Sequence, residues 1–152
     1  MPGPHRARTL SRVDTNTVIA TQLRNLMADG LRGWDGEPLP RSVDAAVRAV
    51  PREAFLPGTP LAEAYGDSPV VTHRDKDGVA TSSASAPGIV AAMLAQLDVH
   101  VGQRILEIGA GTGYNAALLA HLTGPAGHVT TIELDAACLL YTSDAADDLT
   151  RV

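Results

Sequence analysis

Apolar residues recur at helical spacing twice within the first 80 residues. Thr17 to Gly30 carries apolar side chains three or four positions apart, and Gly30 marks the end of the run. Arg41 to Val50 places four apolar residues on one face, and Pro51 ends it because proline disfavours a helical residue before it. His73 to Gly78 has the composition of a turn. Residues 1–80 are therefore predicted to form an N-terminal region of helices and loops.

A second pattern begins at Thr81, where a stretch rich in Ser and Ala runs into an apolar segment. Pro87 suits a first helical turn, which puts Ser85 or Ala86 at the helix cap. The apolar face of this helix is expected to contain Ile89, Val90, Met93, Leu94 and Leu97. A helix is therefore predicted to follow the Ser/Ala stretch directly.

Strand and helix signals alternate after residue 100. Arg104 to Ile108 is a short apolar strand, Gly109 to Gly113 a glycine-rich turn, and Tyr114 to Leu122 an apolar helix. His128 to Glu133 is predicted as a second strand because its centre is β-branched. This strand–helix–strand order favours a parallel, doubly wound sheet of the α/β class. We place this unit and the helix before it at residues 81–137.

The glycine-rich turn carries the strongest chemical signal in the chain. Gly109, Gly111 and Gly113 follow a strand and open a helix. Glycines allow positive φ and let a ligand lie against the backbone, while the helix start offers N–H groups. Glu133 ends the next strand, where a carboxylate can hold the hydroxyls of a ribose. The turn is therefore predicted to bind a cofactor that contains a ribose.

Two cofactor classes use this geometry, and the glycine spacing distinguishes them. Dinucleotide enzymes prefer G-x-G-x-x-G, because a pyrophosphate needs the longer turn. Here the spacing is G-x-G-x-G, with Glu107 two residues before the first glycine. This pattern resembles the first motif of class I S-adenosylmethionine-dependent methyltransferases. The alternatives are a dinucleotide-binding oxidoreductase, a non-enzymatic binding module and an ordinary glycine-rich turn.

The methyltransferase resemblance implies a Rossmann-like class I fold and a set of residues that bind S-adenosyl-L-methionine. They are Glu107, Gly109, Ala110, Gly111, Gly113 and Glu133. Two roles are open for Glu107: a contact with the ammonium group of the cofactor, or hydrogen bonds to the amides of the turn. Asp135 is an alternative to Glu133 as the ribose ligand.

Four sequence blocks between residues 50 and 135 make the resemblance more specific. Val50–Pro57 resembles the V-P-R-x-x-F-x-P segment of protein-L-isoaspartate O-methyltransferases, and Ala64–Asp67 resembles the A-Y-x-D that follows. Ser83–Pro87 resembles the T-I-S-Q-P loop of that family, and Leu106–Tyr114 matches its L-E-I-G-x-G-x-G-Y. The resemblance implies a protein-repair enzyme that methylates carboxylates of L-isoaspartyl residues in proteins or peptides.

Ser85 takes the place of the active-site serine in this resemblance. Its hydroxyl is expected to hydrogen-bond one oxygen of the substrate carboxylate and to aim the other at the methyl group. The carboxylate is already ionised near neutral pH, so no general base is required. The alternative role for Ser85 is a helix N-cap, which serine fills very often. Tyr65 and Asp67 are expected to be loop-packing or hydrogen-bonding residues and not to take part in the chemistry.

Departures from the family pattern lie beside the expected substrate. Ala86 stands where the family has Gln before the proline, and Ser83-Ala84 replaces Thr-Ile. These changes leave the methyltransferase interpretation intact and bear on the choice of substrate. The alternative is a branch of the family that methylates aspartates of precursor peptides in ribosomally made peptide clusters.

Composition limits the remaining classes. The 152 residues are 45% hydrophobic and 19% charged, which permits a folded core. A net charge of -5 argues against a nucleic-acid partner, and no apolar run approaches the roughly 20 residues of a membrane span. Cys138 is the one cysteine and cannot form an internal disulfide, so a cytoplasmic protein is expected. The five histidines lack ligand spacing, so no metal site is expected.

The last segment, residues 138–152, has no clear period. Residues 138–147 resemble the translation of a transposase-type sequencing adapter, with all ten codons in order. We therefore expect a non-native tail from residue 138 and a sheet truncated after its second strand. Such a piece leaves strand edges unpaired and apolar faces uncovered, so we expect marginal stability and no activity from it alone.

Overall fold

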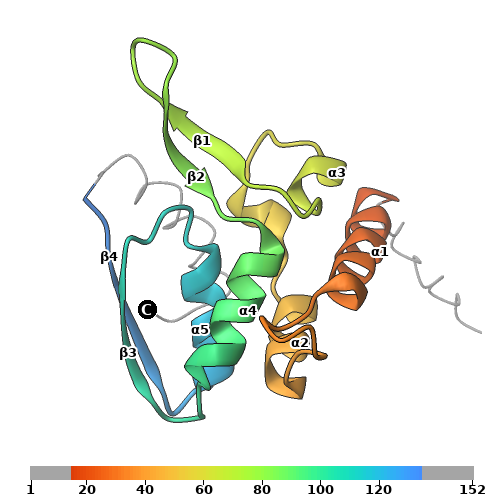
Figure 1. Ribbon diagram of the computed structural model, residues 1–152, viewed down its shortest axis with the longest axis vertical. Helices are drawn as coiled ribbons and strands as arrows, with labels where there is room; N and C mark the ends of the chain where they lie inside the picture. The colour runs from red at the N-terminus through yellow and green to blue at the C-terminus, as the bar shows by residue number, and fades with distance from the viewer. Residues whose placement is uncertain (1–14, 135–152) are drawn as a thin grey trace, which may run out of the picture.

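The computed structural model describes residues 15–134 (Figure 1). The predicted tail from residue 138, with Cys138, and the alternative ribose ligand Asp135 lie outside the described residues. In chain order the elements are α1 (Thr15–Gly30), α2 (Arg41–Ala49), the 3-10 helix η1 (Arg52–Phe55), α3 (Leu61–Ala64), β1 (Val70–Arg74), β2 (Ala80–Ala84), α4 (Pro87–Leu97), β3 (Arg104–Ile108), α5 (Tyr114–Thr123) and β4 (His128–Ile132).

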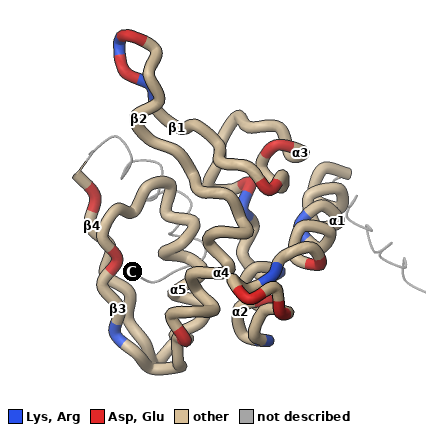
Figure 2. The backbone as a smooth tube through the Cα atoms, viewed as in Figure 1, with Lys and Arg blue, Asp and Glu red and all other residues tan. Residues whose placement is uncertain are grey.

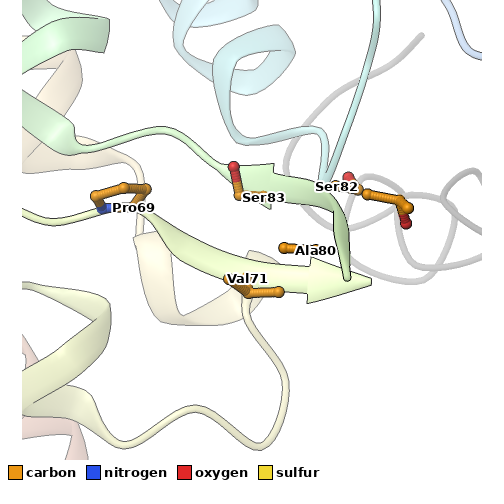
Figure 3. A pocket seen from close by; sticks show the side chains of 6 residues that line it. Pro69, Val71, Ala80, Ser82 and Ser83 are labelled. Atoms are coloured by element: carbon orange, nitrogen blue, oxygen red, sulfur yellow. The ribbon is translucent and has the colours of Figure 1, made fainter. Parts of the chain in front are cut away.

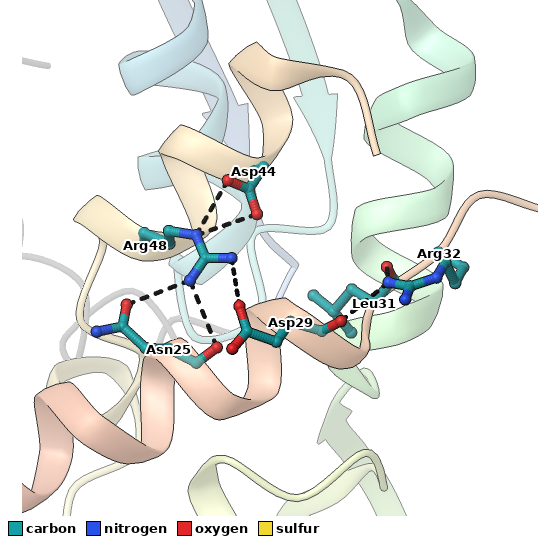
Figure 4. A network of polar contacts seen from close by, with 6 residues as sticks. All are labelled: Asn25, Asp29, Leu31, Arg32, Asp44 and Arg48. Carbon is teal, nitrogen blue, oxygen red and sulfur yellow. Dashed lines mark hydrogen bonds and ion pairs between the residues drawn. The ribbon is translucent and has the colours of Figure 1, made fainter. Parts of the chain in front are cut away.

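The first two helices lie where the hydrophobic spacing predicts them, and a guanidinium joins their polar faces (Figure 4). Arg48 of α2 donates from Nε to both carboxylate oxygens of Asp44, at 3.1 and 3.0 Å. Its Nη2 donates to Asp29 Oδ1 of α1 at 2.7 Å. The hydrogen bonds to Asp44 and then to Asp29 raise the pKa of Arg48. This charge-assisted bridge fixes how α1 lies against α2.

Residues 70–84 form an antiparallel hairpin that the sequence pattern does not predict. β1 and β2 pair from Val70 opposite Ala84 to Arg74 opposite Ala80, and the hairpin projects from the rest of the chain (Figure 1). The turn predicted over His73–Gly78 is wrong at its start, because His73 and Arg74 belong to β1. Asp75 begins the turn, and its carbonyl accepts a hydrogen bond from Gly78 N at 3.0 Å.

The predicted strand–helix–strand unit is confirmed. β3 and β4 are parallel, in register from Arg104 opposite His128 to Ile108 opposite Ile132. α5 connects them as the crossover helix, as parallel neighbours require. β4 ends at Ile132, so the carboxylate of Glu133 lies just beyond the strand and close to the turn that follows β3.

α5 covers one face of the β3–β4 sheet, and within residues 15–134 no helix covers the other face. Val129 and Glu107 are buried on the covered face. Leu106, Ile108 and Ile132 alternate with them along the strands and are 61%, 79% and 50% exposed. Parallel sheets are ordinarily covered on both faces. These apolar side chains of β3 and β4 are therefore exposed on that face.

The hydrophobic core joins the N-terminal helices to the strand–helix–strand unit. Val47 of α2, Phe55 of η1 and Leu118 of α5 are at most 2% exposed. The centroid of the Phe55 ring lies 5.8 Å from that of the Tyr114 ring, at the start of α5. α2 also packs against both α4 and α5. One core therefore crosses the sequence boundary near residue 80 and fixes the start of α4 relative to the start of α5.

Candidate active site

The glycine-rich turn after β3 has a backbone that glycine adopts most easily. The φ angles of Gly109, Gly111 and Gly113 are +89°, +53° and +83°, in the left-handed region. Gly113 N donates to the Ala110 carbonyl at 2.9 Å, and α5 begins at the next residue. A Cβ on Gly109 or Gly111 would meet no described atom within 4 Å. The glycines are therefore required by φ and not by crowding, and the backbone of the turn is open to a ligand.

Hydrogen bonds tie this turn to the end of β4. The carbonyl of Ile132 accepts from Gly109 N at 2.8 Å and from Ala110 N at 3.2 Å. Glu133 Oε2 accepts from Gly111 N at 2.8 Å. Because the two parallel strands end at the same edge of the sheet, residues from both meet at this turn. The structure thus brings together five of the predicted cofactor residues: Gly109, Ala110, Gly111, Gly113 and Glu133.

Glu107 faces the covered side of the sheet and is 9% exposed. Its carboxylate accepts from Asn115 Nδ2 of α5 and from Thr131 Oγ1 of β4, both at 2.7 Å. The alternative role of Glu107 as a partner of the turn amides is wrong, because those amides bond to Ile132, Ala110 and Glu133. Glu107 instead fastens α5 and β4 to β3 beside the turn.

Ser85 lies between β2 and α4, and its side chain is exposed. The N-cap of α4 is Ala86, with φ -55° and ψ 138°, and no side-chain cap hydrogen bond forms there. The alternative role of Ser85 as the helix cap is therefore wrong, because Ser85 lies one residue too early. Within residues 15–134 the Ser85 hydroxyl has no hydrogen-bond partner. That hydroxyl is available to a ligand.

Asp67 caps α4 from a distant loop. Its Oδ1 accepts from the backbone N–H of Gly88, the second residue of α4, at 2.8 Å. A Cβ on Gly88 would lie 2.9 and 3.0 Å from the two carboxylate oxygens of Asp67. The carboxylate therefore occupies the space that a side chain at position 88 would need. A carboxylate at a helix N-terminus also interacts favourably with the helix dipole. The expected hydrogen-bonding role of Asp67 is confirmed.

The buried guanidinium of Arg52 is a feature that sequence reasoning missed. Arg52 is 1% exposed, and its Nε donates to the Ala64 carbonyl at 2.8 Å. Its Nη2 donates to the Ser85 carbonyl at 2.9 Å, and its Cζ lies 4.9 Å from the centroid of the Tyr114 ring. Burial lowers the pKa of Arg52, and nearby Tyr114 acts in the opposite direction. The Arg52 side chain therefore links the Ser85 segment (residues 85–88) to Tyr114, the first residue after the glycine turn.

A second polar network holds η1, which carries Arg52, against α1 and the end of α3. The Tyr65 hydroxyl donates to Glu53 Oε2, and Arg24 Nε donates to the Tyr65 oxygen at 3.2 Å. Arg24 also forms an ion pair with Glu53 at 3.6 Å. Burial, followed by the hydrogen bond to Glu53, raises the pKa of Tyr65. The expected hydrogen-bonding role of Tyr65 is confirmed.

A shallow hollow lies along the hairpin, on the chain just before Ser85 (Figure 3). Its volume is about 290 Å³. It is lined by Pro69, Val71, Ala80, Thr81, Ser82 and Ser83. This lining is uncharged, whereas the hairpin tip carries both signs of charge (Figure 2). The surface formed by the residues just before Ser85 is therefore uncharged, and its side chains are small.

Residues 15–134 contain neither a membrane-spanning helix nor a cluster of metal ligands. No helix in this range is both long enough and apolar enough to cross a lipid bilayer. No group of three or more His, Cys, Asp or Glu side chains in the same range could hold a metal ion.

Comparisons with known sequences agree on one family. Residues 37–144 match the family described as Protein-L-isoaspartate(D-aspartate) O-methyltransferase (PCMT). "Protein-L-isoaspartate O-methyltransferase 1" of Rhodopseudomonas palustris is 51% identical over 122 residues, and a Methanosarcina mazei relative of the same description is 38% identical over 112 residues. These alignments cover 79% and 74% of this chain and 44% and 42% of the relatives. The chain therefore spans less than half the length of these curated relatives.

Solved structures support the same fold. A protein-L-isoaspartate O-methyltransferase chain aligns with a TM-score of 0.69 and 27% identity, over 86% of this chain and 38% of that chain. A Plasmodium falciparum protein of the same description, in complex with S-adenosyl-L-homocysteine, aligns with a TM-score of 0.64 and 19% identity, over 86% and 55% of the two chains. The second likeness bears on the fold alone. The predicted α/β, Rossmann-like fold is confirmed.

Proposed function

Because this chain belongs to the protein-L-isoaspartate(D-aspartate) O-methyltransferase family, we propose that it forms the cofactor-binding part of an S-adenosyl-L-methionine-dependent O-methyltransferase. The proposed substrate is the carboxylate of an L-isoaspartyl residue in a protein or peptide. One observation carries the proposal. The guanidinium of Arg52 contacts both the Ser85 backbone, whose hydroxyl is exposed, and Tyr114, which directly follows the open glycine turn.

The glycine turn fits a cofactor that carries a ribose and no phosphate. Gly109 and Gly111 leave open space beside the backbone, and the longer spacing that a pyrophosphate needs is lacking. We assign the ribose hydroxyls to Glu133, because its carboxylate lies just beyond β4 and is held beside the turn by Gly111 N on Oε2 and Leu134 N on Oε1. We assign the ammonium group to Glu107, whose two oxygens each keep a lone pair. Ala110 and Gly113 contribute the backbone that shapes the turn.

Ser85 is the proposed catalytic residue. When bound, the cofactor supplies a methyl group on a sulfonium. The Ser85 hydroxyl would donate a hydrogen bond to one oxygen of the substrate carboxylate and thereby orient the other. Because the carboxylate is ionised near neutral pH, no residue of the chain has to remove a proton. Catalysis would then consist of in-line placement and exclusion of water.

A titration of the complete gene product with S-adenosyl-L-methionine and, separately, with NAD tests the cofactor assignment. We expect binding of the former, weakened by Glu133→Gln because an amide is a poorer acceptor than a carboxylate for ribose hydroxyls. Binding of NAD instead would point to the dinucleotide-binding oxidoreductase. Binding of S-adenosyl-L-methionine without methyl transfer to any peptide would point to a binding module.

Ser85→Ala tests the catalytic assignment. We expect kcat for an isoaspartyl peptide to fall by about tenfold to hundredfold, since a hydrogen bond to a charged group is lost. The affinity for S-adenosyl-L-homocysteine should stay unchanged, because Ser85 is assigned to the substrate. Ser42→Ala, at an exposed serine near the start of α2, is the matched control and should leave kcat unchanged. An unchanged kcat in Ser85→Ala would remove Ser85 from the mechanism.

A second candidate is the aspartate methyltransferase of a ribosomally made peptide cluster. The small residues Ser83, Ala84 and Ala86 favour it, because they alter the family pattern beside the proposed substrate. Methyl transfer to an isoaspartyl peptide and to an aspartyl precursor peptide, measured side by side, distinguishes the two. The proposed partner is in either case a peptide or protein and neither a nucleic acid nor a membrane. The cytoplasmic location stays a prediction.

A further inference from the structure

Two side chains hold the Ser85 segment from its two ends. Arg52 Nη2 donates to the Ser85 carbonyl at 2.9 Å, and Asp67 accepts from Gly88 N at 2.8 Å. Neither contact involves the Ser85 hydroxyl. Residues 85–88 are therefore fixed through their backbone, while the hydroxyl of the proposed catalytic residue stays exposed.

Arg52 also contacts the element that begins at the glycine turn. Its guanidinium lies 4.9 Å from the centroid of Tyr114, the first residue of α5. Arg52 and Tyr114 are 1% and 4% exposed, so water does not compete for this contact. The planar guanidinium presents its donors at fixed angles, which sets the Ala64 and Ser85 carbonyls relative to each other and to the ring. A change at Arg52 would therefore move Ser85 relative to the glycine turn.

We propose that Arg52 is a positioning residue, which holds the Ser85 hydroxyl at reacting distance from the cofactor bound by the glycine turn. This inference rests on the proposed function. It matters for the rate because a misplacement of about 1 Å can slow an enzyme by about a hundredfold. Arg52 touches neither the turn glycines nor the Ser85 hydroxyl, so we expect most of its effect on the rate to pass through the position of Ser85.

The test is a double-mutant cycle between Arg52 and Ser85 in the complete gene product. Arg52→Met removes the donors and keeps an unbranched side chain, and Ser85→Ala removes the hydroxyl. Methyl transfer to an isoaspartyl peptide is measured at a temperature at which circular dichroism shows each variant folded. We expect Arg52→Met to lower kcat at least about tenfold when Ser85 is present, and less than about twofold in the Ser85→Ala background.

Arg48→Met is the matched control, because Arg48 joins α1 to α2 through Asp29 and Asp44 and contacts neither η1 nor the Ser85 segment. It should lower the melting temperature and leave kcat unchanged. If Arg52→Met does not fold, Arg52→Lys takes its place, and the same pattern is expected because one ammonium cannot present the paired donors of a guanidinium.

Three results would overturn the inference. An equal loss of kcat in the two Ser85 backgrounds would mean that Arg52 acts on the fold as a whole, and the proposed function would stand. A loss of kcat in Arg48→Met as large as in the Arg52 variant would mean the same. A wild-type protein that transfers no methyl group to the isoaspartyl peptide would overturn the proposed function itself, and this inference with it.

Discussion

The two small sheets of the described chain are stabilised in different ways. β1 and β2 are neighbours in sequence, and most of their side chains are exposed. β3 and β4 are parallel, depend on α5 to connect them, and bury the side chains on their inner face. Backbone pairing and a local turn hold the hairpin, whereas packing holds the strand–helix–strand unit. Changes that crowd the packed unit should therefore cost more stability than changes that strain the hairpin turn.

A pair of glycine substitutions gives the largest expected difference. A Cβ on Gly127 would lie 2.8 Å from Thr123 Oγ1 and 2.9 Å from the Gln103 carbonyl, whereas a Cβ on Gly78 would meet no described atom within 4 Å. We expect Gly127→Ala to lower the free energy of unfolding by about 3 kcal/mol through overpacking. Gly78→Ala should cost about 1 kcal/mol, because only its φ of +82° is unfavourable.

Urea unfolding followed by circular dichroism measures both values. Equal losses in the two variants would show that the two sheets are not stabilised differently, and the comparison would fail.

Alkaline pH should weaken the packed unit through Tyr114. Burial raises the pKa of Tyr114 to about 12, while the pKa of tyrosine in an unfolded chain is about 10. Because the unfolded state loses its proton first, this stability is complete below about pH 10 and is lost as the pH rises toward 12. We expect a loss of about 2 kcal/mol across that range.

Urea midpoints measured between pH 9 and 12 in wild type and in Tyr114→Phe check this expectation. The variant should show a shallower decline with pH, because phenylalanine has no proton to lose. Parallel declines in the two proteins would exclude Tyr114 as the cause.

A substitution in the hairpin turn should have the smallest and most local effect. Asp75 Oδ1 accepts from the backbone N–H groups of Asp77 and Val79, both at 2.9 Å. Asp75→Ala removes these bonds and should cost about 1 kcal/mol, seen as faster hydrogen exchange of the hairpin amides. Asp77→Ala is the control, and exchange in β3 and β4 should be unchanged in both variants. Faster exchange in β3 and β4 would mean that the two sheets unfold together.

The difference between the hairpin and the strand–helix–strand unit also explains which parts of the fold could be predicted from the sequence. The span Arg104–Ile108 matches β3 residue for residue, because a short apolar run before glycines is a strong strand signal. The hairpin gives no such signal: Val70 is the one buried residue of β1, and Ala84 the one buried residue of β2. Backbone hydrogen bonds hold this pair of strands together, and such bonds do not depend on residue type. Because apolar and polar side chains do not alternate along the strands, the sequence does not predict the pairing.

One part of the candidate site could likewise be predicted from the sequence, and another part could not. The glycine turn and Glu133 were predictable, because glycines and a strand-end carboxylate occupy fixed places in a strand–helix–strand unit. Arg52 was not, although it lies within the Val50–Pro57 block. Its partners are main-chain carbonyls 12 and 33 residues away, at Ala64 and Ser85. A carbonyl is present at every residue, so no spacing of residue types could identify these two.

The distant cap of α4 has a consequence for the order in which the molecule folds. Ala86 at the N-cap offers no polar side chain, and the carboxylate that bonds to Gly88 N comes from Asp67, 21 residues earlier. A chain in which the loop after α3 has not yet docked has no partner for that amide. The first turn of α4 is therefore completed by a long-range contact. Forming that contact carries the entropic cost of closing the intervening loop. We therefore expect Ser85, one residue before the cap, to reach its final position only after that loop has docked.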